Sequence, residues 1–215
     1  GGGGGNDLDI SGVGNGRIDA DWTDTTYPGT SVGVLSLHGV DNAKMFVKAL
    51  PGSTSDFSVT GLGFKPNFVI LYAIASPGLL NRKTFGIGWA TAQAQACGAF
   101  MDRHNVGTSS CSQVQSNTRL LKLIAYSTLV VDVGLVSFDD DGLTLNDAVG
   151  SQITDIYGLA MKVPNVWMTD VFVPGATGPW SITGCPFEPD VMLVLATSVQ
   201  NMDAFYGNAQ LHMGF

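Results

Sequence analysis

The 215-residue chain has few charged side chains, few cysteines and no long uninterrupted hydrophobic run. Charged residues make up 13% of it, against roughly a quarter of a typical soluble domain. An isolated soluble protein normally keeps its surface charged, so the shortage has two alternative explanations. Either neighbouring subunits cover much of the surface, or the surface is neutral and rich in Ser, Thr, Asn and Gln.

Positive charge is especially scarce. Ten Lys and Arg stand against 18 Asp and Glu, the net charge is -8, and the longest basic cluster is Arg82-Lys83. Phosphate neutralisation needs concentrated positive charge, so the composition argues against a nucleic-acid partner. The longest apolar stretch, 120–138, is interrupted by Lys122 and Asp132 and falls short of the roughly 18 apolar residues of a membrane span. We therefore expect neither nucleic acid nor membrane as a partner.

Three cysteines, Cys97, Cys111 and Cys185, show neither C-x-x-C spacing nor a histidine at zinc-finger distance. The pattern argues against a structural zinc site. Cys97 and Cys111 could bridge neighbouring strands, but the odd count and the apolar surroundings favour buried, reduced thiols.

One segment of the sequence is present twice. Residues 57–71 read FSVTGLGFKPNFVIL, and residues 180–194 read WSITGCPFEPDVMLV. The two copies share Gly, Pro and Thr residues and keep aromatic residues at matching positions. What they have in common is therefore a backbone path and a packing pattern. Such a repeat is typical of a building block of an assembly. The structural repeat residues are Gly61, Phe64, Pro66, Gly184, Phe187 and Pro189.

The remaining pattern is that of a β protein. From residue 32 onward, short apolar runs alternate with Gly, Pro, Asn and Asp about every ten residues. The run 68–72 has no polar alternation, which indicates a strand covered on both faces. The stretch 139–142, DDDG, predicts a hairpin turn, and 91–96 is the best short helical candidate. The predicted strands are 32–38, 43–49, 56–60, 67–74, 84–90, 97–102, 109–114, 119–125, 129–138, 143–146, 155–163, 167–173, 180–183, 190–196 and 205–213.

These elements predict an all-β fold, an antiparallel β-sandwich or jelly-roll-like module, with an incomplete second copy. Residues 1–31 are expected to form a flexible Gly-rich arm, or one draped over a partner. Residues 32–166 form the first predicted module and 167–215 a partial second one. Since 211–215 aligns with 85–89, we expect the polypeptide to continue, or another subunit to supply the missing strands. The opening glycines without Met suggest that the chain begins inside a longer or processed product.

Three segments together resemble a repeat of tailed-bacteriophage virion proteins. They are 63–69 (GFKPNFV), 136–146 (VSFDDDGLTLN) and 157–162 (YGLAMK). The family's modules carry a Gly-Phe-x-Pro-Asp-x-Val start, a Gly-Phe-Thr-Leu-Asn hairpin and a closing Tyr-x-Ala strand. The resemblance covers about 45–163 and part of 168–215, and the chain departs from it at Asn67, at Leu143 and at the inserted Gly158-Leu159. It implies a virion component, of head or tail.

Catalytic and cofactor motifs are weak. The string 29–33 fits G-x-S-x-G around Ser31, but a Pro-Gly turn precedes it and a strand-like run follows, where the nucleophile elbow needs a strand and then a helix. The histidines, His38, His104 and His212, are scattered. We therefore expect no catalytic residue, no cofactor and no enzyme.

Two further candidates are for binding. Asp139, Asp140 and Asp141 are weak calcium ligands without EF-hand spacing. Trp22, in the polar arm, is the candidate contact residue for a sugar, because Trp89 and Trp180 occupy repeat positions that Phe also holds.

The sequence thus predicts a non-enzymatic structural component of a bacteriophage particle, of head-decoration, fibre or tail type. It would act through assembly, as a homo-oligomer of three or more subunits with other virion proteins as partners, and be located in the virion. The alternative is a receptor-binding, lectin-like fibre module that contacts host glycan.

Overall fold

A computed structural model gives the structure of the chain, which divides into two compact units, Gly1–Ser36 and Leu37–Phe215. The residues that the structure describes are 8–14, 17–22, 40–75, 82–103, 110–150, 155–171, 179, 181–189, 192–197, 201–207 and 211–214.

The first unit contains an antiparallel β-hairpin. β1 (Leu8–Gly14) pairs with β2 (Arg17–Trp22), and the register shifts between Ile10 and Gly12. The predicted strands begin only at residue 32, so this hairpin differs from the expectation for the arm. Apolar residues alternate with polar ones at 18–22 of β2, which is the period that a strand requires.

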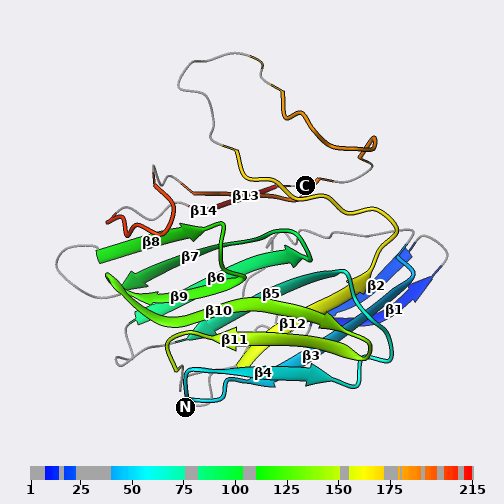
Figure 1. Cartoon of the computed structure of the whole chain (residues 1–215), viewed down its shortest axis with the longest axis horizontal. Helices are drawn as coiled ribbons and strands as arrows, with labels where there is room; N and C mark the ends of the chain where they lie inside the picture. The colour runs from blue at the N-terminus through cyan, green and yellow to red at the C-terminus, as the bar shows by residue number, and fades with distance from the viewer. Residues whose placement is uncertain are drawn as a thin grey trace. The chain divides into compact units, whose positions relative to one another are not determined.

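The second unit is a β-sandwich, which confirms the predicted fold class (Figure 1). Its six-stranded sheet has the order β3-β12-β5-β6-β7-β8 and its four-stranded sheet the order β4-β11-β10-β9, all antiparallel. A separate pair, β13-β14, follows. The bounds are β3 Asn42–Ala49, β4 Ser55–Thr60, β5 Phe68–Ala75, β6 Arg82–Thr91, β7 Gln95–Arg103, β8 Ser110–Ser116, β9 Leu121–Ala125, β10 Thr128–Asp139, β11 Gly142–Asp147, β12 Asp155–Lys162, β13 Val194–Thr197 and β14 Leu211–Gly214.

The main core lies between the two sheets. Alternate residues of β5 point into it, and Val69, Leu71 and Ala73 are fully buried there. Leu143 and Leu145 of β11 come from the facing sheet. Each large aliphatic side chain buried in this way stabilises the fold by about 1.5 to 3 kcal/mol. Because these side chains alternate along the strands, the period-two pattern also determines which face of each sheet turns to the core.

β9 crosses β6 at two glycines. A Cβ atom on Gly86 would meet the carbonyl oxygen of Lys122, and one on Gly88 would meet the carbonyl oxygen of Leu120. Real Cβ atoms do not approach backbone that closely, so the two glycines permit the strand of one sheet to lie directly on the other.

Most predicted strands are present. Residues 167–171, 181–183 and 205–207 form no strand, and 32–38 lies outside the described residues. The helical candidate at 91–96 is wrong, because the segment is the turn from β6 to β7. There the Thr91 hydroxyl accepts hydrogen bonds from the N–H groups of Gln93 and Ala94, at 3.3 and 3.2 Å.

Candidate functional site

The Asp-rich hairpin was the only predicted metal candidate, and its turn is confirmed between β10 and β11, where Asp139 pairs with Gly142. Asp141 does not project freely from it. Its Oδ2 accepts a hydrogen bond from the Gly61 N–H at 3.0 Å, and its Oδ1 accepts one from the Gly63 N–H at 2.5 Å. Both glycines have positive φ, 79° and 82°, a conformation that other residues rarely adopt. The carboxylate therefore fixes the first copy of the repeated turn.

The other two acids have separate contacts. Asp139 accepts hydrogen bonds from the hydroxyls of Ser137 and Thr144, at 2.8 and 2.7 Å, and these bonds lower the pKa of its carboxyl. Asp140 is fully exposed and lies 3.7 Å from the ammonium of Lys65. Among the described residues, no three His, Cys, Asp or Glu side chains are grouped to hold a metal ion.

Removal of the Asp141 carboxylate should loosen this turn. We expect Asp141→Ala to lower the free energy of unfolding by about 1 to 2 kcal/mol, because two N–H groups lose a charged acceptor. Asp140→Ala, one position away and fully exposed, should stay within about 0.5 kcal/mol of wild type. Urea denaturation of both variants measures the difference, and equal effects would contradict the role assigned to Asp141.

The second copy of the repeat agrees with the first in part. Gly184 has a φ of 94°, close to that of its counterpart Gly61. β13 pairs with β14 in the register that β5 has with β6, since Val194 faces Gly214 as their counterparts Leu71 and Gly88 face each other.

The two copies differ upstream of this pairing. Residues 181–183 form no strand, whereas 58–60 belong to β4. Gly63 is replaced by Pro186, whose ring excludes the positive φ of Gly63. Phe64 packs against the main core and Pro66 is buried, while Phe187 is half-buried and Pro189 is exposed. The repeat as a whole stays a prediction.

The remaining predicted candidates are placed only in part. Trp22 ends β2, and His212 lies in β14; their side chains lie outside what the structure describes. Ser31, His38, His104 and Trp180 also lie outside the described residues.

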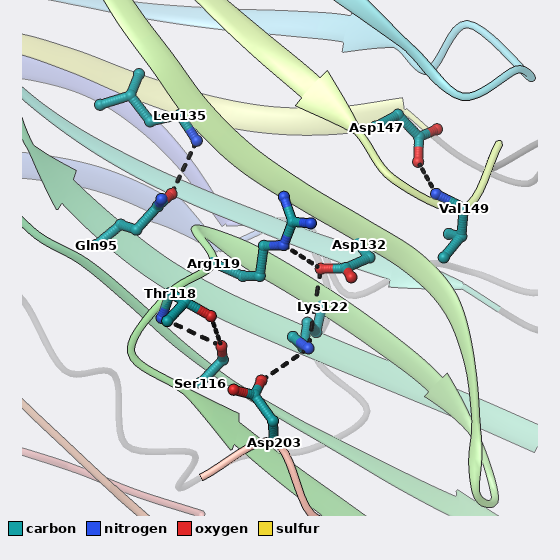
Figure 2. Close-up of polar contacts among 10 residues, drawn as sticks. All are labelled: Gln95, Ser116, Thr118, Arg119, Lys122, Asp132, Leu135, Asp147, Val149 and Asp203. Atoms are coloured by element: carbon teal, nitrogen blue, oxygen red, sulfur yellow. Dashed lines mark hydrogen bonds and ion pairs between the residues drawn. The ribbon is translucent and has the colours of Figure 1, made fainter.

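A buried charged cluster, absent from the predictions, lies at the end of the sandwich where β9 and β8 meet (Figure 2). Lys122 of β9 and Asp132 of β10 are direct cross-strand partners, only 5% and 7% exposed. The Lys122 ammonium lies 3.9 Å from Asp132 Oδ1 and 2.9 Å from Asp203 Oδ1. Arg119 Nε lies 3.3 Å from the same Asp132 oxygen.

Burial controls how these groups titrate. Loss of water raises the pKa of Asp132, and the positive charges of Lys122 and Arg119 oppose that rise. Burial would also raise the pKa of Asp203, but hydrogen bonds from Lys122 and Ser116 lower it overall.

Residues 201–207, here called the strap, connect this cluster to the edge of the six-stranded sheet. The Asp203 N–H donates to Gln115 O at 2.7 Å, and Tyr206 exchanges two backbone hydrogen bonds with Gln113, at 3.0 and 3.1 Å. Phe205 packs on a second core cluster that includes Met101 and Ile124. The ion pair between Lys122 and Asp203 therefore anchors the strap.

The three cysteines are present as thiols. All three lie in the described part of the chain, and none forms a disulfide. Cys97 faces Ser116 and Cys111 faces Asp102. The two cysteines therefore lie on neighbouring strands, β7 and β8, but not opposite each other. Burial raises the pKa of the Cys97 thiol to about 12, which suppresses the reactive thiolate.

We expect iodoacetamide to leave Cys97 unmodified in the native protein at pH 8, because this thiol is both buried and protonated. After unfolding in urea it should react as readily as the half-buried Cys111 and Cys185. Peptide mass spectrometry reads each site separately. Labelling of native Cys97 as fast as Cys185 would contradict its placement.

The outer face of the six-stranded sheet, turned away from the four-stranded sheet, carries a central apolar region. Residues that face one another across neighbouring strands share a face, and two such rows cross β3, β12, β5 and β6. Neither row contains a charged residue. The rows are Met45, Leu159, Ile70 and Trp89, and Val47, Tyr157, Tyr72 and Ile87.

This face is open at its β3–β12–β5 end. Met45 is 70% exposed, Val47 60%, Ile74 58% and Tyr157 37%. The rings of Tyr72 and Tyr157 stack with their centroids 5.2 Å apart. The run 68–72 was expected to be covered on both faces. The four-stranded sheet covers the inner face of this run. On the outer face, Ile70 and Tyr72 are only half-buried.

The chain was compared with protein-family models, curated proteins and solved structures. No family model, no curated protein and no solved structure matches the chain. No helix in the described part is long and apolar enough to cross a membrane.

Proposed function

We propose that the chain is a non-enzymatic structural subunit of a bacteriophage particle, in a head-decoration, fibre or tail position, that acts by assembling with copies of itself and with other virion proteins. The observation that carries the assembly part is the pair of exposed, uncharged rows on the outer face at β3, β12 and β5. Contiguous apolar surface of this kind marks an interaction site in most soluble proteins. The virion part rests on the resemblance of 63–69, 136–146 and 157–162 to phage repeats.

The chemistry of the described residues also suits assembly better than catalysis. The one thiol with a strongly raised pKa is buried, and the ion pairs of Lys122 join β9 to β10 and to the strap. A catalytic site needs a nucleophile or an acid–base group that a substrate can reach. The groups with shifted pKa values serve the fold instead.

The test is the presence of the chain in purified particles. Particles are banded on a density gradient, washed in high salt and digested, and peptides such as 123–162 are sought by mass spectrometry. We expect the chain to remain with the particles at a fixed ratio to the other structural proteins. Recovery only from the soluble fraction would overturn the proposal.

The second candidate, a glycan-binding fibre module, is favoured by one observation, the stacked pair Tyr72 and Tyr157 on an exposed face. Aromatic faces accept sugar rings, but specific sites add a few placed polar groups. Beyond the two phenol hydroxyls of the pair and the indole N–H of Trp89, the two rows add no polar side chain. A glycan array decides between the two: reproducible binding to one glycan class, lost in Tyr157→Ala, would favour the fibre module.

A further inference from the structure

One end of the outer face is already covered by the chain itself. β13 and β14 both contact β7, and the inner side of β7 is taken by β9 and the core around Ala99 and Met101. The β13-β14 pair must therefore lie over the outer side of β7. Gln113 of β8 lies in the same cross-strand row as Phe85 and Phe100 on the outer face. Its side chain is only 1% exposed, as expected if this end of the face is covered.

The covering element is itself a hairpin of the β5–β6 type. β13 and β14 pair in the register of β5 and β6, so this face receives, within one molecule, an element that resembles part of its own sheet. The most exposed side chains on the face belong to β3, β12 and β5, which are the strands farthest from the covered end. The exposed part of the outer face is thus continuous with the part that already binds the β13-β14 hairpin.

We propose that a second copy of this chain docks on the β3–β12–β5 end of the outer face, sheet against sheet. The proposal rests on the assembly function proposed above and names its partner. The two central rows carry no charge, although each chain carries -8, and the exposed Asp155, in the next row of β12, lies at the rim of this contact. A charged or polar partner would leave its own groups without hydrogen bonds on this surface.

The edge strand β3 is compatible with such a contact. It ends the six-stranded sheet. Its outward residues include Met45 and Val47, while Lys44 turns to the opposite side and donates a hydrogen bond to Gly61 O at 2.6 Å. Lysines on an edge strand commonly block association, but here the nearest one is directed away from the apolar rows.

The size of the face sets the strength of the contact. Three strands of about eight residues cover roughly 14 by 26 Å, or about 370 Å² in projection. Stable interfaces bury about 800 Å² per partner. We therefore expect a reversible dimer in solution, with the contact reinforced where other subunits hold the copies together.

The test is sedimentation of the full chain from about 5 to about 500 µM, a range suited to a weak, reversible contact. The weight-average mass should rise from 22.5 kDa towards that of a dimer. Met45→Lys combined with Val47→Lys should weaken association at least tenfold, because two ammonium groups would be buried in each copy. Both side chains are exposed in the monomer, so the thermal unfolding of the variant should be unchanged.

The matched control is Val136→Lys, a 54% exposed apolar residue on β10 of the other sheet, which should leave association unchanged. Hydrogen exchange should slow in 42–49 as concentration rises. A wild type that stays monomeric, or a control that weakens association as much as the double variant, would overturn the interface.

A photoreactive residue at Met45 or Val47, cross-linked in particles, gives a test in which the interface and the virion function can fail separately. Links from β3 to a second copy support the interface, and links only to a different protein overturn it while leaving the virion function intact. If the chain is absent from particles but still dimerises through Met45 and Val47, the interface stands and the virion assignment fails.

Discussion

Gly88→Ala should destabilise the protein by about 3 kcal/mol, the upper end of the usual cost of overpacking. The new methyl group would meet the carbonyl oxygens of Leu120 and Ala96 and the Cβ of Cys97. These atoms belong to backbone or lie next to it, so no side-chain rotation can relieve the contact. For a domain of this size the melting temperature should fall by roughly 6 to 12 °C.

The control for this prediction is Gly207→Ala in the strap. A Cβ atom there meets nothing within 4 Å, and the residue does not have positive φ, so we expect a change below about 0.5 kcal/mol. Scanning calorimetry and urea denaturation measure both variants. If Gly88→Ala were as stable as wild type, β9 could not lie directly on β6.

Lys122→Met should also cost about 3 kcal/mol. Loss of the ammonium leaves Asp132, 7% exposed, with only Arg119 as a positive partner, and breaking a buried ion pair typically costs about 3 to 5 kcal/mol. The lower figure applies because the Asp203 side chain is 43% exposed and regains water. Lys162→Met, exposed on β12, should change stability by less than about 0.5 kcal/mol.

A second variant and the pH dependence separate charge from packing. Asp132→Leu added to Lys122→Met should restore most of the loss, since an apolar pair can replace a buried ion pair. In Lys122→Met the pKa of Asp132 is raised further above its unfolded value of 3.8, and the folded state then binds the proton more tightly. The deficit should therefore be smallest below about pH 4 and grow as pH rises through the folded pKa. A deficit independent of pH would contradict this account.

The sequence predicted strands well where local pattern decides. Apolar alternation and turn residues are properties of neighbouring residues, so β3 to β12 were found within a few positions. The Asn-Gly pair at 15–16 is also a strong hairpin signal, and the hairpin of β1 and β2 could have been predicted from it.

Pairing between distant segments could not be predicted in the same way. The segment 181–183 resembles 58–60, but 58–60 is a strand because Val59 pairs with Leu143 of β11. No strand in the described residues pairs with 181–183. The similarity between the two segments therefore extends to the positive φ of Gly184, but it does not decide whether 181–183 joins a sheet.

The candidate sites were the least predictable part. Lys122 and Asp132 entered the prediction only as interruptions of an apolar stretch. Opposite charges inside the most apolar segment are a usable signal, because burial of one charge requires the other. The outer face could not be recognised, since the apolar residues of β5 suit a strand with both faces covered as well as one with an open face.

The strap has a consequence for synthesis of the protein. β8 and Lys122 emerge from the ribosome well before Asp203 and Tyr206, which later pair with them. During that interval the β8 edge has no backbone partner from the strap, and Lys122 relies on Asp132 alone. Unpaired edges invite contact with other nascent chains, so slow translation between β12 and the strap should increase aggregation, and a chaperone that shields sheet edges should suppress it.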